Sequence, residues 1–195
     1  MKMIYALMLL FASVLLLGCD NSNDPAPDPG HVKVFVTSVS ANQGNLGGLA
    51  GADAICTDLA TMNGGLTGTW TAWLSDDTTD AADRINAGGE PYQLINGTVI
   101  AADYSDLVDG TLAAPIQIDE SGNDVTSNFE VWTATAADGS YNTQIGTCLN
   151  WTSAGAGENA GIGISNSTER LWTNWTGRNC DDFGRLYCFA DANSP

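Results

Sequence analysis

The sequence predicts a small disulfide-bonded domain of the α+β class. Two stretches rich in strand-favouring residues, His31 to Ser40 and Thr69 to Ser75, flank one clear helix pattern. The second half of the chain is dominated by short apolar pieces that alternate with Gly, Asn, Asp and Ser. Four cysteines after residue 30 could cross-link so much loop. We therefore expect mixed sheets, one or two short helices and a long loop-rich lobe.

The first elements follow from local patterns. In residues 31–40 Val32, Val34 and Val36 alternate with other residues, as expected of a strand with one buried face. The glycine-rich turn that follows leads into a short helix, with Ile55 and Leu59 four residues apart on one face. We expect Gly64 and Gly65 to end this helix.

The next elements are shorter. Residues 69–75 (TWTAWLS) predict a strand that is covered on both faces. Residues 79–85 predict one or two helical turns, with Asp80 as a cap and Asp83 in the spacing of a capping box. Residues 116–135 predict a hairpin that turns at Glu120 to Asn123 (ESGN) and returns as the strand VWTAT.

The amino-terminal region has the form of an export signal. Lys2 precedes an uncharged apolar run from Met3 to Gly18, which is shorter than the roughly 20 residues of a membrane-spanning helix. Leu16, Leu17 and Gly18 resemble a bacterial lipobox, in which the following cysteine, here Cys19, is acylated. The alternative is ordinary signal cleavage near Gly18, which would leave Cys19 as a free thiol.

Three segments follow from this interpretation. Residues 1–18 form the signal peptide, and residues 19–30 (CDNSNDPAPDPG) form a flexible tether because they lack large apolar side chains. Residues 31–195 are enough for one well-buried core and short for two, so we expect a single domain. The predicted location is the bacterial cell envelope, at the inner or the outer membrane.

The charge of the chain limits its partners. All 23 acidic residues but only five of the six basic residues follow Cys19, so this part carries five positive against 23 negative charges, a net of −18. Such a surface repels nucleic acids, heparin-like polyanions and anionic lipid headgroups. Cations, neutral glycans and proteins stay possible partners, and we expect membrane contact through the lipid anchor only.

Six segments taken together resemble the C-type lectin-like fold, and within it the endostatin domain. They lie in the expected order: VKVFVTSVS, GLAGADAIC, GTWTAWLS, IQIDESGNDV, VWTAT and NCDDFGRLYCF. The resemblance covers about residues 32–189. Relatives of this domain occur in bacterial lipoproteins.

The resemblance implies a nested pairing of the cysteines. Spacing alone allows three pairings of four cysteines. By resemblance, Cys56 on the first helix pairs with Cys188 on the last strand, and Cys148 pairs with Cys180. The outer bridge would join the two ends of the domain, and the inner one would close the loop-rich lobe.

The resemblance also indicates where a ligand could bind. Calcium-dependent lectins of this fold use a Trp-Asn-Asp strand, whose position here reads LWTNWTGRNC. In this chain the aspartate of that strand is replaced, and the lobe contains no Glu-Pro-Asn loop. The lobe offers only Glu158 and Glu169 as acidic ligands, whereas calcium needs six to eight oxygen ligands. We therefore expect no resident metal or cofactor, with calcium as the minor alternative.

The candidate ligand-binding residues lie near the inner bridge. Asn174, Arg178 and Asp181 would exchange hydrogen bonds with a ligand, and Trp172 or Trp175 would stack against a sugar face. The alternatives are that Asp181 and Asp182 pair with Arg178 and Arg185 on a surface turn and that the tryptophans belong to the core.

The favoured function is a non-catalytic binding module for a protein, of host or matrix origin, or a neutral glycan. The first alternative is a structural envelope protein that self-associates. The second is a glycoside-type hydrolase, for which the paired carboxylates would be Asp76 with Asp77 or Asp103 with Asp106. We predict no catalytic residue, since solvated loop acids are far commoner than catalytic pairs.

Overall fold

The structure, a computed structural model, describes residues 30–40, 43–85 and 87–191. Cys19, the apolar run from Met3 to Gly18 and the predicted tether up to residue 29 lie outside these residues. Within the described ranges, no helix has both the length and the apolar character needed to cross a membrane. The chain forms two mixed or antiparallel sheets with short helices, which confirms the α+β class.

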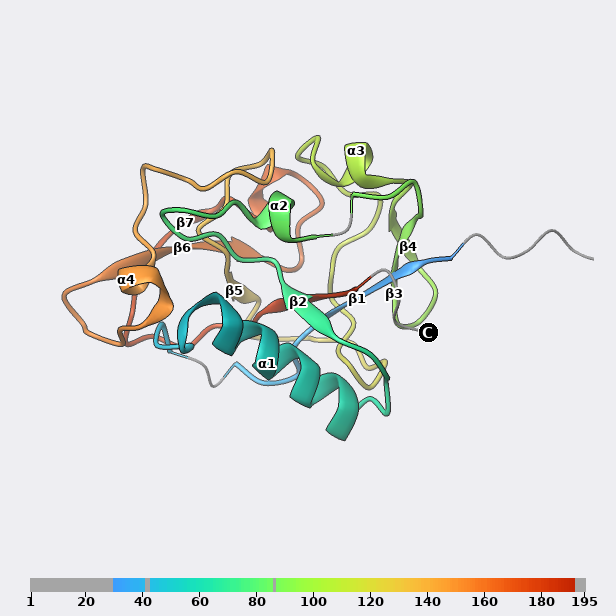
Figure 1. Cartoon of the computed structure of the whole chain (residues 1–195), viewed down its shortest axis with the longest axis horizontal. Coiled ribbons are helices and arrows are strands. Elements are labelled where there is room, and N and C mark those ends of the chain that lie inside the picture. Colours follow the sequence, from blue (N-terminus) through green and yellow to red (C-terminus); the bar gives the residue numbers. More distant parts are fainter. Residues whose placement is uncertain (1–29, 41–42, 86, 192–195) are drawn as a thin grey trace, which may run out of the picture.

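The larger sheet has five strands in the order β2-β8-β1-β3-β4 (Figure 1). It pairs β1 with β3 in parallel, and its other neighbours are antiparallel. The strands are β1 (Val32–Val36), β2 (Trp70–Ala72), β3 (Tyr92–Leu94), β4 (Val99–Ala101) and β8 (Tyr187–Ala190). The first and last strands are neighbours, with Val34 opposite Phe189, so the two ends of the domain meet in the middle of this sheet.

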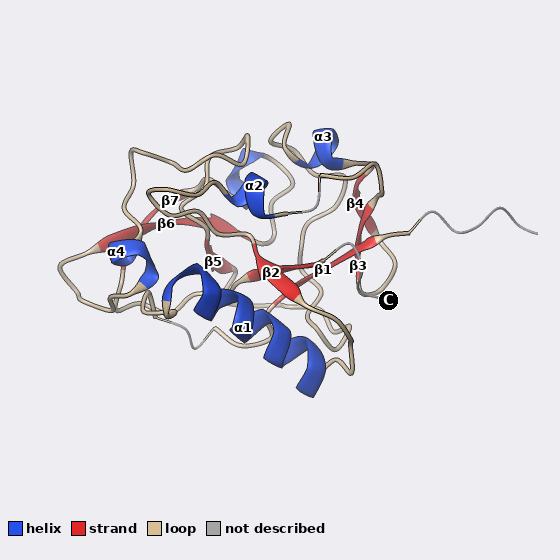
Figure 2. Ribbon diagram, in the orientation of Figure 1, coloured by secondary structure: helices blue, strands red, loops and turns tan. Residues whose placement is uncertain are grey.

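Both faces of β1 are buried, although the alternation predicted one buried face. Val32, Val34 and Val36 belong to one core cluster, and Phe35 belongs to a second cluster on the opposite face. Helix α1 (Gly48–Met62) covers the face of Phe35 and packs beside β2, as Figure 2 shows. The expected alternation of side chains is therefore present, but each set enters a separate core.

Helix α1 lies close to the sheet because its buried positions are small. Ala52, Cys56 and Ala60 are fully buried, while the predicted contact residues Ile55 and Leu59 are only partly buried. These three residues are four apart and so share one face of the helix. The predicted stop is confirmed, since the helix ends just before the Gly64–Gly65 pair.

The short helices are held by loops as much as by their own caps. Helix α2 (Ala81–Arg84) follows Asp80 as predicted, but the Asp80 carboxylate accepts a hydrogen bond from the Tyr141 amide at 2.7 Å and makes no cap. The predicted capping box is wrong because the loop that ends at Tyr141 folds over α2, and Ala82 N donates to Gly139 O at 3.1 Å. Helix α3 (Tyr104–Leu107) does carry a cap, from Asp103.

The second sheet is antiparallel, with the order β5-β6-β7. Its strands are β5 (Glu130–Trp132), β6 (Asn159–Ile164) and β7 (Thr176–Asn179). The predicted hairpin forms its turn, with Ile118 opposite Asp124, but its return strand is wrong: β5 pairs with β6. The loop lobe between Cys148 and Cys180 thus supplies two strands and the 3₁₀ helix η1 (Arg170–Trp172).

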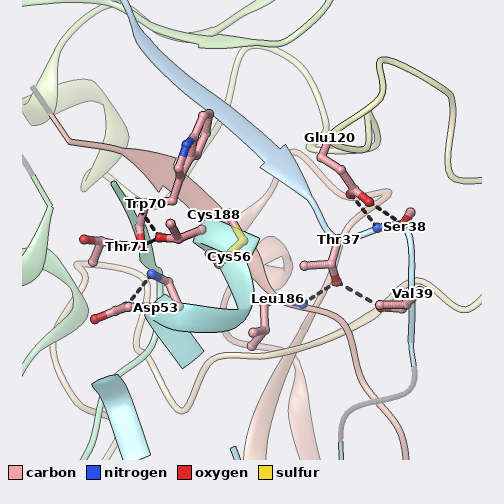
Figure 3. Close-up of a disulfide and its surroundings, with 12 residues drawn as sticks. Thr37, Ser38, Val39, Asp53, Cys56, Trp70, Thr71, Glu120, Leu186 and Cys188 are labelled. Atoms are coloured by element: carbon pink, nitrogen blue, oxygen red, sulfur yellow. Dashed lines mark hydrogen bonds between the residues drawn. A yellow bond between two sulfur atoms is a disulfide. The ribbon is translucent and has the colours of Figure 1, made fainter. Parts of the chain in front are cut away.

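The two disulfides pair as the resemblance implied. Cys56 on α1 is bonded to Cys188 on β8, and Cys148 is bonded to Cys180 directly after β7. Figure 3 shows the first bridge between the helix and the large sheet. The first bridge spans 132 residues and the second spans 32, so one joins the ends of the domain and the other fastens the small sheet.

A buried polar network fixes the loop after β1. The Glu120 carboxylate accepts hydrogen bonds from Ser38 N at 2.9 Å and from Ser38 Oγ (Figure 3). Its neighbour in the network, Asn63 Nδ2, donates to the same carboxylate at 3.2 Å. Glu120 is 1% exposed, and these bonds compensate its carboxylate for the water it has lost.

The segment labelled α4 (Cys148–Trp151) is a single left-handed turn. The φ angles of Cys148, Leu149 and Asn150 are each 52°, and that of Trp151 is 62°. Residues other than glycine rarely take this conformation, because it brings Cβ close to a carbonyl oxygen. The bridge from Cys148, the burial of Trp151 and a bond from Trp151 Nε1 to Ser75 O at 2.8 Å hold the turn in place.

Candidate functional site

Exposed polar groups and an exposed tryptophan lie along β7. A hollow of about 440 Å³ runs beside this strand, and we call it the β7 groove. Its volume is within the range of small-ligand sites. It is lined by Asn159, Ile162, Trp175, Thr176, Gly177, Arg178, Asn179 and Asp182.

The register of the small sheet places the residues that line the groove. Asn159 and Ile162 of β6 lie opposite Asn179 and Thr176 of β7. The chain then leaves β7 at Cys180, which the bridge to Cys148 fixes. The groove is therefore built on a strand pair with one cross-linked end.

Arg178 is the only basic residue that lines the groove, and it is paired twice. Its Nη1 donates to Glu130 Oε1 at 2.9 Å, and its Nε lies 3.2 Å from Asp182 Oδ2. Glu130 is on β5, so the guanidinium extends across β6 over the face of the sheet. These ion pairs agree with the alternative prediction that Arg178 takes part in charge pairing at the surface. They also fix the direction of the Arg178 side chain.

Two exposed aromatic residues line hollows that share this ion pair. Trp175 is 41% exposed and lines the β7 groove. Phe183 is 54% exposed and lines a neighbouring hollow of about 280 Å³, which shares Arg178 and Asp182 with the groove. Exposed aromatic faces beside hydrogen-bonding groups are typical of sites that bind sugars or peptides.

Trp172 belongs to the core, which corrects the prediction that it could stack on a ligand. It is fully buried, and its ring lies 5.2 Å from that of Trp73 and 5.7 Å from that of Tyr187. Tyr187 Oη donates to Trp172 O at 2.9 Å, and burial raises the pKa of the Tyr187 hydroxyl well above its ordinary value. Of the two tryptophans proposed for stacking, Trp175 is the one at the surface.

The other predicted residues lie close to the groove without lining it. Asn174 Oδ1 accepts from Asn142 Nδ2 at 3.0 Å, so its amide is already used to join two loops. Asp181 is exposed, and its backbone oxygen accepts from Gln43 Nε2 at 2.6 Å. The structure therefore brings Trp175 and Arg178 together and places Asn174 and Asp181 at either end of β7.

Most residues that line the groove were not among the predicted ligand-binding residues, which include only Trp175 and Arg178 of this set. Asp182 was expected only as a partner in charge pairing, and it does pair with Arg178. Asn159 and Glu130 reach the site only through the pairing of β6 with β7 and with β5. The pairing of β5 with β6 has no local sequence pattern, because a long loop segment separates these two strands in the chain.

The paired carboxylates have structural partners. Asp103 accepts hydrogen bonds from Ser105 Oγ at 2.7 Å and from Asp106 N at 3.0 Å, and the bond from Ser105 is the main cause that lowers the pKa of Asp103. Asp106 Oδ2 in turn accepts from Ala102 N at 2.7 Å. Both carboxylates therefore accept from backbone N–H groups at the amino-terminal end of the short helix α3.

Asp76 and Asp77 are used in the same way. Asp76 Oδ1 accepts from the amide and the hydroxyl of Thr78, both at 2.9 Å. Asp77 Oδ1 accepts from Asn150 Nδ2 at 2.8 Å, which ties the loop after β2 to the left-handed turn. Each of the four acids therefore has a role in local structure.

A second hollow of about 480 Å³ lies at the left-handed turn, lined in part by Leu149, Tyr141 and Glu158. Glu169, the other acid of the lobe, lines a separate hollow beside η1. Within residues 30–40, 43–85 and 87–191, no three His, Cys, Asp or Glu side chains are grouped as metal ligands would be.

These features define a class of protein: a disulfide-bonded α+β domain with an exposed groove on a small antiparallel sheet. The chain belongs to the family described as protein of unknown function (DUF1554), whose model matches residues 39–169. This match includes α1 and β6 and ends before β7. No curated protein matches the chain.

Proposed function

We propose that this protein is an exported, non-catalytic binding module with a C-type lectin-like, endostatin-like fold. It recognises a neutral glycan or a protein through the β7 groove. The observation that carries this proposal is the exposed Trp175 beside the polar wall made by Arg178, Asn179 and Asp182.

The fold part of the proposal is supported by the topology. The first and last strands pair in one sheet, a helix is bonded to the last strand through Cys56 and Cys188, and the second bridge closes the lobe. The six segments that resemble the endostatin domain include β1, β2, β5 and β8. This nested arrangement is what the resemblance implies.

The chemistry of the groove favours an uncharged ligand or a cationic one. An indole ring offers a flat apolar surface to the C–H face of a sugar or to an apolar side chain. Hydroxyl, amide and carboxylate groups around it can exchange hydrogen bonds with hydroxyl or peptide groups of the ligand. The excess of 23 acidic over six basic residues disfavours polyanions.

A non-catalytic role is supported by the paired carboxylates. Each acid in the two pairs accepts hydrogen bonds from a neighbouring turn, cap or side chain. These bonds give each carboxylate a structural role, and the bond from Ser105 lowers the pKa of Asp103, which is unfavourable for a general acid.

Export is supported by the two disulfides, which form and persist in oxidising compartments. We propose that Cys19 is lipidated after removal of residues 1–18 and anchors the domain in the bacterial envelope. Mass spectrometry of the mature amino terminus tests this. An acylated Cys19 is expected, and an unmodified cysteine would contradict the anchor.

The binding proposal is tested by replacing Trp175 with Ala in the disulfide-bonded protein. Binding to a glycan array and to immobilised matrix proteins is expected to fall about tenfold or more, because the loss of an aromatic anchor costs at least about 1 to 2 kcal/mol. The matched control is Met62→Ala, which removes an even more exposed apolar side chain, 73% exposed, at the end of α1.

Two outcomes would contradict the proposal. Equal loss of binding in both variants would place the site elsewhere or show a general effect of surface apolarity. Absence of any ligand, combined with concentration-dependent association in light scattering, would favour a self-associating envelope protein.

A further inference from the structure

The outer side of β7 is an open sheet edge. The small sheet has the order β5-β6-β7, so β7 is its last strand, and no strand in the described ranges pairs with its other side. Three of the four residues of β7 are exposed, and the fourth, Arg178, is partly exposed. An open edge of this kind can accept a further strand.

The register determines which backbone groups point outward. Gly161 of β6 uses both of its backbone groups on the side away from β7, since its N donates to Gly146 O at 3.1 Å and its O accepts from Thr133 N at 3.1 Å. Gly161 is therefore in a non-hydrogen-bonded pair with its partner Gly177. It follows that the N–H and C=O of Gly177 point away from β6, toward the open edge.

Two common protections of an edge strand, a charge directed at the edge and a proline, are missing from β7. Edge strands are commonly guarded by a charged side chain or a proline that prevents pairing. The sequence of β7 is Thr-Gly-Arg-Asn, and its one charge, Arg178, is directed across the sheet to Glu130 on β5. The small Gly177 at the centre of the edge leaves room for a second backbone.

The charges around the edge select the occupant. Arg178 is shared by two acids, Glu130 and Asp182, so this cluster keeps a net negative charge, and the exposed Asp181 adds to it just after β7. A second copy of this chain carries the same excess of acidic residues and is repelled. The segment DNSNDPAPDPG of this chain is acidic and proline-rich, which disfavours it as a strand.

We propose that the β7 edge binds an extended, basic polypeptide segment as a fourth strand of the small sheet. Its backbone pairs with Gly177, and its alternate side chains reach Trp175 and the acidic groups beside Asp182. This inference rests on the proposed function as a binding module, and it chooses a polypeptide over a glycan as the partner of the same site.

The test uses two substitutions at one position. Gly177→Pro removes the outward N–H and fills the edge with the proline ring, while the bonds between β7 and β6 keep their donors. Gly177→Ala keeps the N–H, and its Cβ would meet Ile145 Cγ2 at 3.4 Å, an ordinary contact. The probe is a peptide of about nine residues that alternates threonine and lysine, with an alternating threonine and glutamate peptide as its counterpart.

Titration of the disulfide-bonded protein with the labelled peptides is followed by fluorescence anisotropy. We expect the basic peptide to bind the wild type and Gly177→Ala with similar affinity and to bind Gly177→Pro about tenfold or more weakly. Binding should weaken as salt is raised, and the acidic peptide should bind at least about tenfold more weakly. Thermal melts of both variants show whether they fold like the wild type.

Other outcomes overturn the inference. Equal binding of the basic peptide to both variants would mean that no strand is added at β7. If Gly177→Pro does not fold, the wild type is titrated instead with a basic peptide that is N-methylated at alternate residues. N-methylation removes the backbone donors of the peptide, so unchanged affinity for this probe would also exclude strand pairing.

The failure of this inference differs from the failure of the proposed function. If no peptide binds but a glycan binds and depends on Trp175, the groove is a glycan site and only the strand addition is wrong. If neither ligand class binds, both proposals fail. Self-association that disappears in Gly177→Pro would assign the edge to a second copy of the chain.

Discussion

Arg185 is a buried cation that joins three parts of the chain. It is 6% exposed, and its guanidinium donates to the backbone oxygens of Thr37, Ser127 and Asn128. Desolvation lowers the pKa of Arg185, while the charges of Asp119 and Glu120 oppose this shift. The residue stays charged because even a lowered guanidinium pKa lies far above neutral pH.

We expect Arg185→Lys to destabilise the protein by about 2 to 3 kcal/mol. Lysine keeps the charge but cannot reach three carbonyl groups with a fixed planar fork, and hydrogen bonds from charged groups contribute about 1.5 to 3 kcal/mol each. Chemical denaturation measures the effect. The control is Arg170→Lys, because Arg170 is exposed and its guanidinium donates a hydrogen bond to Asn174 O. Equal destabilisation by the two changes would contradict the structural role of Arg185.

At the scale of elements, the left-handed turn is the most unusual segment. Leu149 has a φ of 52° and is 64% exposed, so it bears the steric cost of this conformation and gains little from packing. Its neighbours explain why the cost is tolerated. Cys148 is bonded to Cys180, and Asn150 bonds to Asp77 and to Thr147.

Leu149→Gly should therefore stabilise the protein by about 0.5 to 1 kcal/mol. Glycine takes a positive φ without a Cβ clash, which outweighs the added flexibility of the unfolded chain. Thermal unfolding with both disulfides intact provides the measurement. Leu149→Ala keeps the clash and should have no such benefit, and a loss of stability in the glycine variant would show that the Leu149 side chain is needed for packing.

Sequence reasoning located elements that are coded locally and missed those that depend on distant pairing. The valine alternation of β1 and the glycine pair after α1 are local signals, and both led to correct elements. The strand from Val131 was assigned to a nearby hairpin, whereas β6 supplies its partner and comes from far along the chain. The left-handed turn has no glycine, and the only residue in it that favours a positive φ is Asn150, which is too weak a signal to predict the turn.

The candidate site, like the fold, could be predicted only in part from the sequence. Trp175 and Arg178 were identified from their place before Cys180, and both line the β7 groove. The burial of Trp172 could not be foreseen, because a tryptophan next to a loop is equally compatible with core and surface. Its ring contacts Trp73, directly after β2, and Tyr187, on β8, and only the folding of the chain brings these segments together.

At the scale of the whole molecule, the two disulfides act on different parts. In the chain-entropy model, closing 132 residues stabilises the protein by about 5 kcal/mol and closing 32 residues by about 4 kcal/mol, as upper values. The first bridge joins α1 to the centre of the large sheet. The second joins the left-handed turn to the end of β7.

We expect replacement of Cys148 and Cys180 by Ala to abolish binding at the β7 groove while the large sheet stays folded. Replacement of Cys56 and Cys188 should instead lower the unfolding midpoint of the whole domain. Hydrogen exchange by mass spectrometry separates the two cases, since local opening would be confined to residues 145–180 in the first variant. Uniform loss of protection in both variants would show a single cooperative unit.

The adjacency of β1 and β8 has a practical consequence. Val34 lies opposite Phe189 in the large sheet, and Figure 1 places the start of β1 at the opposite end of the molecule from β7. Immobilising the domain on a sensor chip through a tag at either extremity would leave the groove facing the bulk solution. Because the start of β1 and the end of β8 are close together, the domain could also be inserted into a surface loop of a carrier protein. The two ends of that loop would then need to be only a short distance apart.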